Sequence, residues 1–572
     1  MIYLSPRKLI VIVLVIAFLI RLPGIFYGLP YHLLADEEAN IYGALKMIEL
    51  KTVLPVLHRA DFDGLLYYPP ILAYIYAILF IPAIAIMHIV SGYSLDTLKD
   101  LLILNPSVFW YIARSLSIFF SLAGIYMVYR IGEDLFSDKR FAIIAAFLYS
   151  ISFLETSMAN TAHHWTAGMF FALLSAYLVL KATAHNVDNS KRLLVFAGLI
   201  MGVSFGISFL VFYIPPLVLL IFYYSLKNSD KNSIMYLNAI KNTLHFLIPF
   251  GLVALLILAV HPGAFSFQAL HTGDTPPHTG EFVFNFIIYY AHALWNFEVP
   301  LLLLSVYAFI RLFFKKRKLF YLIVISLLIM AGIMYKTMYD NPRYLLPLIP
   351  VLVLLSAYAC KEFSPLIQVK KGRILIYSCA SLLLIYLIAV YGRYEILLFK
   401  PDTRLLAKNW IENNIPNEST VITDSDRLRF MSTPDSITTL EKIDKSALRG
   451  HDRVLLRRPD YAEHSFNVYP LFFLVGDNRQ KLIKSALSRK DSNTYVIVDN
   501  LILDRSYIYG LVSHGVLIKN FWSNIALHDR HDLFIGGEKT DTNLHLLELL
   551  YSVDYLGPNI SVYKIDSKKS AL

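Results

Sequence analysis

Asp36, Glu37 and Glu38 form a run of three acids that follows an apolar segment covering residues 9–27. Carboxylates can accept protons and bind cationic groups, so an acidic run beside a membrane-length segment is a candidate for chemistry at a membrane surface. The run alone is a weak signal, because acids at an interface are often only hydrated. Its significance depends on the other polar residues that the chain brings to the same side.

Further unusual polar groups are expected at membrane depth or just outside it. They are Asp61 and Asp63 in the same loop as the acidic run, Arg114 in an apolar helix, Glu155, His163 and His164 in LETSMANTAHHW, and Arg343 and Tyr344 in NPRYLLPLIP. An ionised side chain inside a membrane is costly, so Arg114 is expected to have an anionic partner, either a lipid phosphate or an acid on another helix. For Arg343, near a helix end, the alternative to a functional role is an anchor that snorkels to the interface.

The composition assigns the chain to the polytopic α-helical membrane proteins. Of its 572 residues 56% are apolar and only 16% are charged, and apolar runs of roughly 17 to 25 residues can cross a bilayer as helices. After residue 392 polar residues become frequent, and short apolar stretches such as TYVIVDN are typical of strands. We therefore expect a transmembrane catalytic domain over residues 1–392, with an external loop at about 27–107, and a soluble α/β domain over residues 393–572.

The distribution of basic residues predicts the orientation. The net charge of +10 does not indicate a nucleic-acid partner, because lysines and arginines cluster in alternate short gaps between apolar runs, as expected for cytoplasmic loops. The N-terminus is then cytoplasmic, and the loop with Asp36 and the C-terminal domain are extracytoplasmic. Parity of crossings requires either that one apolar segment does not cross or that LDTLKDLLILNPS conceals an extra passage. Residues 71–90, interrupted by Pro82, are favoured as a juxtamembrane or re-entrant helix. About eleven spanning helices remain, within a total of about 11–13.

Five motifs occur in an order that resembles a known family. They are ADEEANIYGALKMIEL, LYYPPILAY, ARSLSIFFSLAGIYMVYRIGEDLF, NPRYLLPLIPVLVLLSAYA and PDTRLLAKNWIENNIPNESTVI. This order is similar to that of the polyprenyl-phosphate-sugar-dependent glycosyltransferases of the GT-C fold, which include protein O-mannosyltransferases and bacterial lipid A aminoarabinose transferases. The resemblance covers roughly residues 10–421.

The resemblance implies an integral enzyme of the cell or inner membrane that acts in the cell envelope. Its donor would be an undecaprenyl- or dolichyl-phosphate sugar, and its acceptor an extracytoplasmic protein, lipid or glycan. The resemblance further implies that Asp36 is the catalytic base with Glu37 in support, that Arg114, Arg343 and Tyr344 bind the donor phosphate, and that the anomeric configuration is inverted. A base suits this reaction because a neutral acceptor must lose a proton as it attacks.

The chain departs from the family pattern at two places. Members often carry an Asp near the position of Trp165, and often a charged residue before Pro-Pro, where this chain has Tyr67 and Tyr68. His163 and His164 could compensate by contacting phosphate or by binding a divalent metal, although adjacent side chains on a helix rarely point the same way. Asp61, Asp63 and Glu155 are further candidates for substrate or metal binding.

Two other features limit the alternatives. Cys360 and Cys379 are the only cysteines and both lie in apolar runs, which excludes a disulfide framework and a cysteine-based zinc site. The main rival function is a transporter or flippase of lipid-linked sugars, because intramembrane charges also line transport paths. Transporters usually contain repeats and midplane sites, whereas this chain shows no repeat and gathers its charges towards one face.

Overall fold

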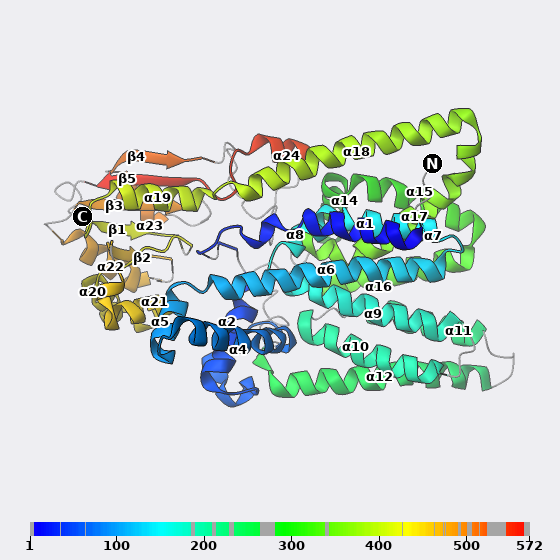
Figure 1. Cartoon of the computed structure of the whole chain (residues 1–572), viewed down its shortest axis with the longest axis horizontal. Coiled ribbons are helices and arrows are strands. Elements are labelled where there is room, and N and C mark those ends of the chain that lie inside the picture. Colours follow the sequence, from blue (N-terminus) through cyan, green and yellow to red (C-terminus); the bar gives the residue numbers. More distant parts are fainter. Residues whose placement is uncertain are drawn as a thin grey trace.

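The computed structural model describes most of the chain. The described residues are 5–31, 33–34, 36–62, 64–184, 189–208, 213–227, 234–263, 281–337, 342–425, 427–462, 464–472, 474, 476–489, 493–499, 506–513, 515–522 and 545–565. They form a helical bundle and, at one end of it, a smaller domain built around a β-sheet (Figure 1). The expected class, a polytopic helical membrane protein with a C-terminal α/β domain, is confirmed.

Within the described residues, eight helical segments are long and apolar enough to cross a membrane. They are built on α1 (Pro6–Leu19), α4 (Ile71–Ser91), α6 (Ser107–Leu135), α9 (His164–Ala184), α10 (Ser190–Ser208), α12 (Ile234–Val260), α17 (Ile349–Phe363) and α18 (Lys370–Phe399). Leu252, Leu255 and Leu256 of α12 are more than 60% exposed, which suits a surface that faces lipid. The chain is an integral membrane protein.

Two further helix pairs would each count as one span with a bend. They are α7 (Lys139–Ser150) with α8 (Phe153–Ala159), bent by 61°, and α14 (Glu281–Phe297) with α15 (Val299–Lys315), bent by 117°. With these pairs the count over the described residues rises to ten. Three more helical segments complete this part, namely α11 (Ile214–Lys227), α16 (Arg317–Thr337) and the 3₁₀ turn η4 (Pro342–Leu348).

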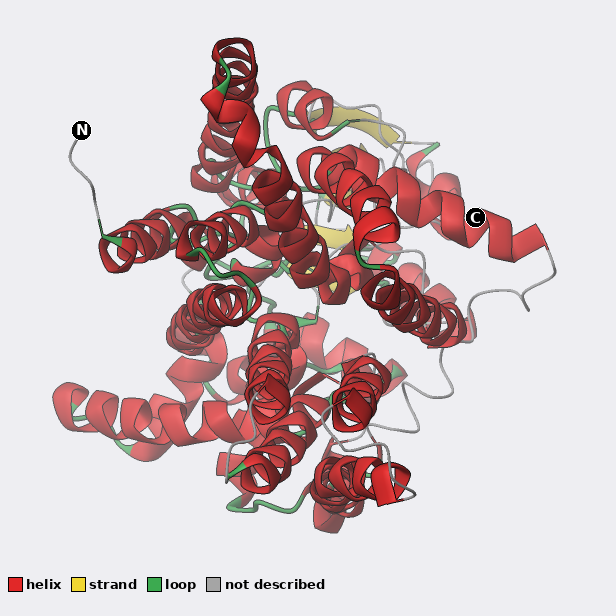
Figure 2. Cartoon of the chain, turned by 90° about the vertical axis from the view of Figure 1, so that its right-hand side faces the viewer, coloured by secondary structure: helices red, strands yellow, loops and turns green. Residues whose placement is uncertain are grey.

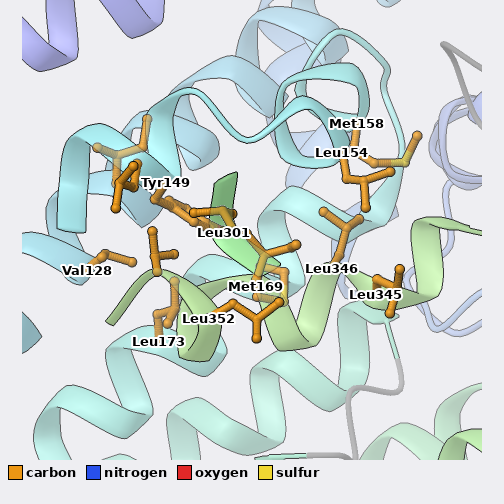
Figure 3. Packing of buried hydrophobic residues seen from close by; sticks show 14 of the residues in the cluster. Val128, Tyr149, Leu154, Met158, Met169, Leu173, Leu301, Leu345, Leu346 and Leu352 are labelled. Atoms are coloured by element: carbon orange, nitrogen blue, oxygen red, sulfur yellow. The ribbon is translucent and has the colours of Figure 1, made fainter. Parts of the chain in front are cut away.

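The long helices run side by side along the long axis of the molecule, and Figure 2 shows most of them end-on. Their core is a continuous apolar cluster in which α6, α7, α8, α9, α15, η4 and α17 meet (Figure 3). Between α10 and α12 the backbones approach so closely that a Cβ at Gly198 would lie 2.1 Å from the carbonyl oxygen of Phe246. Small residues permit such close approach of helices in membranes.

The segment between α1 and α6 lies at the end of the bundle that carries the sheet. It contains α2 (Glu37–Leu50), the short α3 (Arg59–Phe62), α4 and α5 (Leu95–Leu104). In Figure 1, α4 is seen nearly end-on, whereas α6, α9, α10 and α12 run horizontally across the picture, along the long axis of the molecule. The helix over residues 71–91 is long and apolar enough for a span, so its juxtamembrane position stays a prediction.

The C-terminal sheet has five strands in the order β2-β1-β3-β5-β4. They are β1 (Thr420–Thr423), β2 (Asn467–Pro470), β3 (Thr494–Asp499), β4 (Gly515–Phe521) and β5 (Ile560–Ile565). The first three are parallel, and β5 is antiparallel to both of its neighbours. Side chains alternate between two cores, because Ile422 and Val496 belong to one and Val421 and Ile497 to the other.

Helices cover the sheet and connect it to the bundle. They are α19 (Thr403–Asn414), α20 (Pro434–Ile443), α21 (Gly450–Arg457), α22 (Gly476–Leu487), α23 (Ser506–Val512) and α24 (Leu546–Ser552). α18 continues without a break through Arg393 to Phe399, and α24 packs against it. The Tyr27 hydroxyl donates to Asp402 at 2.5 Å, and Arg404 donates to the Leu33 carbonyl at 3.1 Å. The C-terminal domain is therefore fixed on the segment that holds the acidic run.

Candidate active site

Asp36 is the residue directly before α2, and its backbone is left-handed, with φ of 66°. A non-glycine residue in this region is uncommon and carries a conformational cost unless its surroundings hold it there. Its side chain does not cap α2. The backbone conformation instead directs the carboxylate to three donors from distant parts of the chain.

The three donors around Asp36 come from three different segments. The Tyr67 hydroxyl donates to Oδ1 at 2.9 Å, and Nη1 of Arg343 donates to Oδ2 at 3.1 Å. Nε2 of His163 lies 3.4 Å from the same Oδ2, and since a carboxylate only accepts, the ring nitrogen is the donor. The Asp36 side chain nevertheless remains 24% exposed and that of Arg343 15% exposed, so a substrate can reach this pair.

Opposing effects set the ionisation of Asp36. Burial raises the pKa of its carboxyl group, but the hydrogen bond from His163 and the positive charge of Arg343 outweigh burial and hold the pKa below its ordinary value. Burial chiefly lowers the pKa of His163, which keeps its imidazole neutral at neutral pH. Asp36 is thus a stable carboxylate that already has a cation beside it.

Glu37, the next residue, lies in a closed pocket. Its two oxygens receive Nε and Nη2 of Arg114, each at 2.8 Å, together with the indole N–H of Trp110 at 3.0 Å and the backbone N–H of Ala162 at 2.7 Å. The side chains of Glu37 and Arg114 are both 0% exposed. Four donors on one carboxylate make this pair an anchor for the start of α2.

Arg114 is occupied on all sides. Its third nitrogen, Nη1, donates to the carbonyl oxygens of Gly24, Ile25 and Tyr27 at 3.2, 3.1 and 2.6 Å. The expected binding of donor phosphate by Arg114 is therefore corrected, because no side of the guanidinium is open to a ligand. The other expectation, that Arg114 pairs with an acid and holds segments together, describes what the structure shows.

The segment that carries Asp36 and Glu37 contacts the turn between α8 and α9, and the contacting residues are adjacent in both segments. Asp36 contacts His163, while Glu37 accepts from the backbone of Ala162. The turn between α8 and α9 thus fixes the position of both acids, and the Arg114 pair secures the turn from the other side. The contacts of Glu37 are all with the protein's own groups, and they hold the segment next to Asp36 in place.

Aromatic rings form one wall of the site. The His164 ring lies 4.1 Å from the Tyr68 ring between centroids, and the Trp165 ring lies 5.6 Å from that of Tyr344. The guanidinium of Arg343 lies 5.5 Å above the Tyr344 ring, within the range of a cation–π contact. Tyr344 is thereby placed beside Arg343, and His164 belongs to the wall without contacting Asp36.

Three of the other candidate residues are not part of this cluster or cannot be placed in it. Glu155 is buried with Arg21 and accepts from Ser121 at 2.6 Å. Asp61 is 45% exposed and lies 3.9 Å from Lys46. Asp63 lies outside the described residues. In the described part of the chain, neither Glu155 nor Asp61 contacts Asp36.

The described residues contain no group of three histidine, cysteine, aspartate or glutamate side chains that could hold a metal ion. His163 and His164 differ in surroundings, because His163 faces Asp36 and His164 packs on Tyr68. Within the described part of the site, only the pair of Asp36 and His163 offers ligand atoms close together. The histidine pair therefore fits hydrogen bonding better than metal binding.

Several site residues carried no usable signal in the sequence. In the sequence Tyr67 is only a departure from the family pattern before Pro-Pro, yet its hydroxyl donates to Asp36. Arg21 lies at the end of the first apolar run, where a basic residue is ordinarily an anchor, and it forms a buried pair with Glu155. Glu38 pairs with Arg427 and Arg429 of the C-terminal domain. These pairings depend on the three-dimensional fold rather than on spacing.

The chain was compared with known proteins. Residues 107–252 match the model of the dolichyl-phosphate-mannose-protein mannosyltransferase family. This stretch runs from α6 into α12 and includes Arg114 and His163 but neither Asp36 nor Arg343. No curated protein sequence matches the chain.

Two solved structures match much of the chain at low identity. One is the archaeal oligosaccharyltransferase AglB from Archaeoglobus fulgidus in complex with an inhibitory peptide and a dolichol-phosphate, with 14% identity and a TM-score of 0.42 over 86% of this chain and 69% of that chain. The other is ArnT from Cupriavidus metallidurans bound to undecaprenyl phosphate, with 13% identity and a TM-score of 0.43 over 90% and 96% of the two chains. Identities this low leave the family match as the finding that bears on function.

The stretch that matches the family model contributes two residues to the site. Arg114 binds Glu37, and His163 contacts Asp36. The resemblance to the membrane glycosyltransferases that use polyprenyl-phosphate sugars is thus confirmed over residues 107–252, the stretch that matches the dolichyl-phosphate-mannose-protein mannosyltransferase family.

Proposed function

We propose that the protein transfers a sugar from an undecaprenyl- or dolichyl-phosphate donor to an extracytoplasmic acceptor, with Asp36 as the base. The observation that carries this proposal is the contrast between adjacent acids. Glu37 is closed off by Arg114, whereas Asp36 and Arg343 form an ion pair with exposed surface on both side chains. An accessible carboxylate and an accessible guanidinium are the two groups that the reaction requires.

Each group has one task in the transfer. The acceptor's hydroxyl or amine attacks the anomeric carbon, a new bond forms there, and the bond from that carbon to the phosphate oxygen breaks. The acceptor's proton passes to the Asp36 carboxylate as the attack proceeds. The phosphate leaves with the bonding electrons, and Arg343 stabilises its negative charge, with Tyr344 beside the guanidinium. A single displacement of this kind inverts the anomeric configuration.

The lowered pKa of Asp36 fits this role. The carboxylate is already ionised when the acceptor binds, so it can accept a hydrogen bond and orient the attacking atom. The Asp36 carboxylate is basic enough to take the proton only late in the attack. By then the forming bond has made the acceptor's proton acidic, and the Arg343 guanidinium has turned towards the departing phosphate. Loss of Arg343 as its partner raises the basicity of Asp36 at the moment of transfer.

The buried ion pairs do not support the transporter alternative. Glu37 with Arg114 and Glu155 with Arg21 are buried ion pairs whose side chains are at most 3% exposed. Charges that line a transport path must face a cavity. These pairs connect segments of the chain instead.

The test is a transfer assay with the full-length protein in lipid vesicles. A panel of radiolabelled polyprenyl-phosphate sugars is supplied with envelope extract as acceptor, and label that leaves the lipid is counted for the wild type and for Asp36→Asn. We expect transfer by the wild type and a loss of about 10² to 10⁴-fold in the variant, the usual contribution of a positioned general base. Equal rates would show that Asp36 is not the base.

The matched control is Asp61→Asn. Asp61 belongs to the same loop and is also an acid, but it is 45% exposed and has no contact with Asp36. Transfer by this variant should equal that of the wild type. A comparable loss in both variants would indicate a general disturbance of the loop rather than lost catalysis.

A further inference from the structure

Four consecutive residues at the start of α9 have buried polar side-chain atoms without a hydrogen-bond partner in the described part of the chain. These atoms are Nδ1 of His163, Nδ1 of His164, Nε1 of Trp165 and Oγ1 of Thr166. All four residues are at most 5% exposed. A buried polar group without a partner is costly, and native proteins contain few of them. Four in succession indicate a place where the protein meets a ligand.

A fifth such group comes from the end of α10. Two hydrogen bonds fix α9 and α10 in an antiparallel register, from the Ser175 hydroxyl to the Ala197 carbonyl and from the Ser204 hydroxyl to the Gly168 carbonyl, each at 2.8 Å. One turn beyond Ser204, this register brings Ser208 level with the first residue of α9. The Ser208 hydroxyl is also buried and has no hydrogen-bond partner among the described residues. The two helix ends therefore contribute to one polar cluster.

The start of α9 lies beside Arg343. The Trp165 ring lies 5.6 Å from the Tyr344 ring, above which the Arg343 guanidinium lies at 5.5 Å. The Tyr213 hydroxyl donates to a carbonyl of η4 at 2.6 Å and lies 3.8 Å from the sulfur of Met169 in the second turn of α9. Figure 3 shows Met169 in the same apolar core as residues of η4. The segment with Arg343 is thus held against the beginning of α9.

The polar groups of this cluster can all act as donors. An indole N–H only donates, and hydroxyl groups and imidazole nitrogens can donate. The Trp165 ring is stacked on the rings of His163 and His164, at 6.4 and 5.3 Å between centroids, so it lies over the helix start. The first N–H groups of a helix have no partner within it, and the ring of His163 does not cap them, because its Nε2 faces Asp36. Donors at the positive end of a 21-residue helix match an anion.

We propose that the start of α9 binds the phosphate of the polyprenyl-phosphate donor, with the indole N–H of Trp165 and the hydroxyl of Ser208 as donors to its oxygens. This inference rests on the proposed transfer reaction and adds the groups that hold the donor before the attack. In the structure Arg343 is paired with Asp36. Neutral donors hold the phosphate while this ion pair persists, and the guanidinium then stabilises the charge that develops as the phosphate leaves.

The experiment measures binding of the phosphate without its sugar. Radiolabelled undecaprenyl phosphate and dolichyl phosphate are titrated onto the full-length protein in detergent, and the matching alcohols, undecaprenol and dolichol, are measured by competition. Each alcohol has the same tail with a neutral hydroxyl in place of the phosphate, so it reports binding by the tail alone. The variants are Trp165→Phe, which keeps an aromatic ring but removes the N–H, and Ser208→Ala.

Each variant has a matched control. Ser204→Ala removes a hydroxyl one turn earlier on α10 that is already paired with the Gly168 carbonyl. Trp295→Phe changes an indole on α14 that is 50% exposed. Thermal unfolding of every variant measures whether the fold is intact.

We expect Trp165→Phe and Ser208→Ala to bind the polyprenyl phosphates about tenfold more weakly than the wild type, the usual effect of one lost hydrogen bond to a charged group. The dissociation constants of the two alcohols should be the same in these variants as in the wild type. Ser204→Ala and Trp295→Phe should retain the wild-type affinity for all four lipids.

Three results would overturn the inference. Unchanged affinity of Trp165→Phe and Ser208→Ala for both phosphates would leave their polar groups to water or to the sugar. An equal loss for phosphate and alcohol, or a comparable loss in Ser204→Ala, would show a disturbed tail path or helix contact rather than a lost phosphate contact. A wild type that binds the phosphates no more tightly than the alcohols would show that the site does not recognise the anion.

The phosphate subsite and the transfer reaction can fail independently. Asp36→Asn keeps every donor of the subsite, so it should still bind both phosphates when transfer is lost. Normal transfer with unchanged phosphate binding in Trp165→Phe would contradict the subsite alone. Loss of phosphate binding in Trp165→Phe together with full transfer by Asp36→Asn would contradict only the role of Asp36 as the base.

Discussion

Asp36 and Glu37 are adjacent acids that both pair with an arginine, yet their surroundings are opposite. Glu37 and Arg114 have no exposed surface, whereas Asp36 and Arg343 are 24% and 15% exposed. Glu37 receives four donors from the protein itself, and the donors of Asp36 leave part of its carboxylate open. The difference separates two tasks, because a closed ion pair can hold a loop in place and an open one can meet a substrate.

A second buried pair strengthens the comparison. Arg21 and Glu155 connect the end of the first helical segment to α8, and Ser121 completes the acid's contacts. Breaking a buried pair leaves an uncompensated charge, so such pairs are strict structural constraints even where they add little net stability. Accessibility, rather than the presence of an acid at membrane level, therefore distinguishes the candidate catalytic residue.

The largest effect is expected when the closed pair is broken. Arg114→Met should lower the free energy of unfolding by about 3 to 5 kcal/mol, because the Glu37 carboxylate would remain buried without its cation. Arg343→Met should cost no more than about 1 kcal/mol, as partly exposed pairs contribute little. Thermal unfolding in detergent measures both. Similar losses in the two variants would remove the distinction between a closed and an open pair.

The next effect concerns the open pair. Arg343→Gln should reduce kcat by about 10²-fold, the usual loss when one preorganised donor to a developing charge is removed. The purified enzyme is assayed with saturating donor, so that weaker binding alone cannot account for the loss. Arg311→Gln is the control, since Arg311 pairs with Glu362 on the part of α17 remote from η4. An unchanged kcat in Arg343→Gln would exclude Arg343 from stabilisation of the leaving phosphate.

A smaller effect is expected for the neutral donor to Asp36. Tyr67→Phe removes one hydroxyl at 2.9 Å from Oδ1 and should lower kcat/KM by about tenfold, the value of one hydrogen bond to a charged group. Tyr74→Phe, which removes a hydroxyl that donates to the Val53 carbonyl, is the matched control and should be silent. A loss for Tyr67→Phe as large as that for Asp36→Asn would assign the proton transfer to the tyrosine.

The smallest expected effect is the response of the wild type to pH. The pKa of Asp36 is lowered in the folded protein, so its ion pair contributes stability above the ordinary aspartate pKa and loses it only as pH falls through the lower, folded value. Between pH 8 and about pH 5 the wild-type kcat/KM should therefore show no acidic decline due to Asp36. Arg343→Gln removes one of the groups that lower the pKa of Asp36, while the hydrogen bonds from His163 and Tyr67 remain, so any acidic decline should lie at a higher pH than in the wild type. A pH profile identical in both proteins would contradict this electrostatic coupling.

The sequence predicted the helical class well because hydrophobic runs must satisfy the same condition, burial in lipid, wherever they fold. It also singled out Asp36, Arg343 and His163, which the structure brings together. It could not assign a partner to Arg114, because an intramembrane arginine requires an anion whether that anion is a substrate or Glu37. The contact of Arg427 with Glu38 could not be predicted either, because these residues are 389 positions apart and meet only through the packing of the C-terminal domain.

The span of chain between Asp36 and Arg343, 307 positions, has a consequence for biosynthesis. The ribosome completes Asp36 early and must synthesise all helices up to α16 before η4 appears, so the nascent protein holds this carboxylate without its cationic partner. The loop with Arg427 follows later still. The contact between Asp36 and Arg343 is therefore among the last to form, and the contacts of Glu38 with the C-terminal domain form after it.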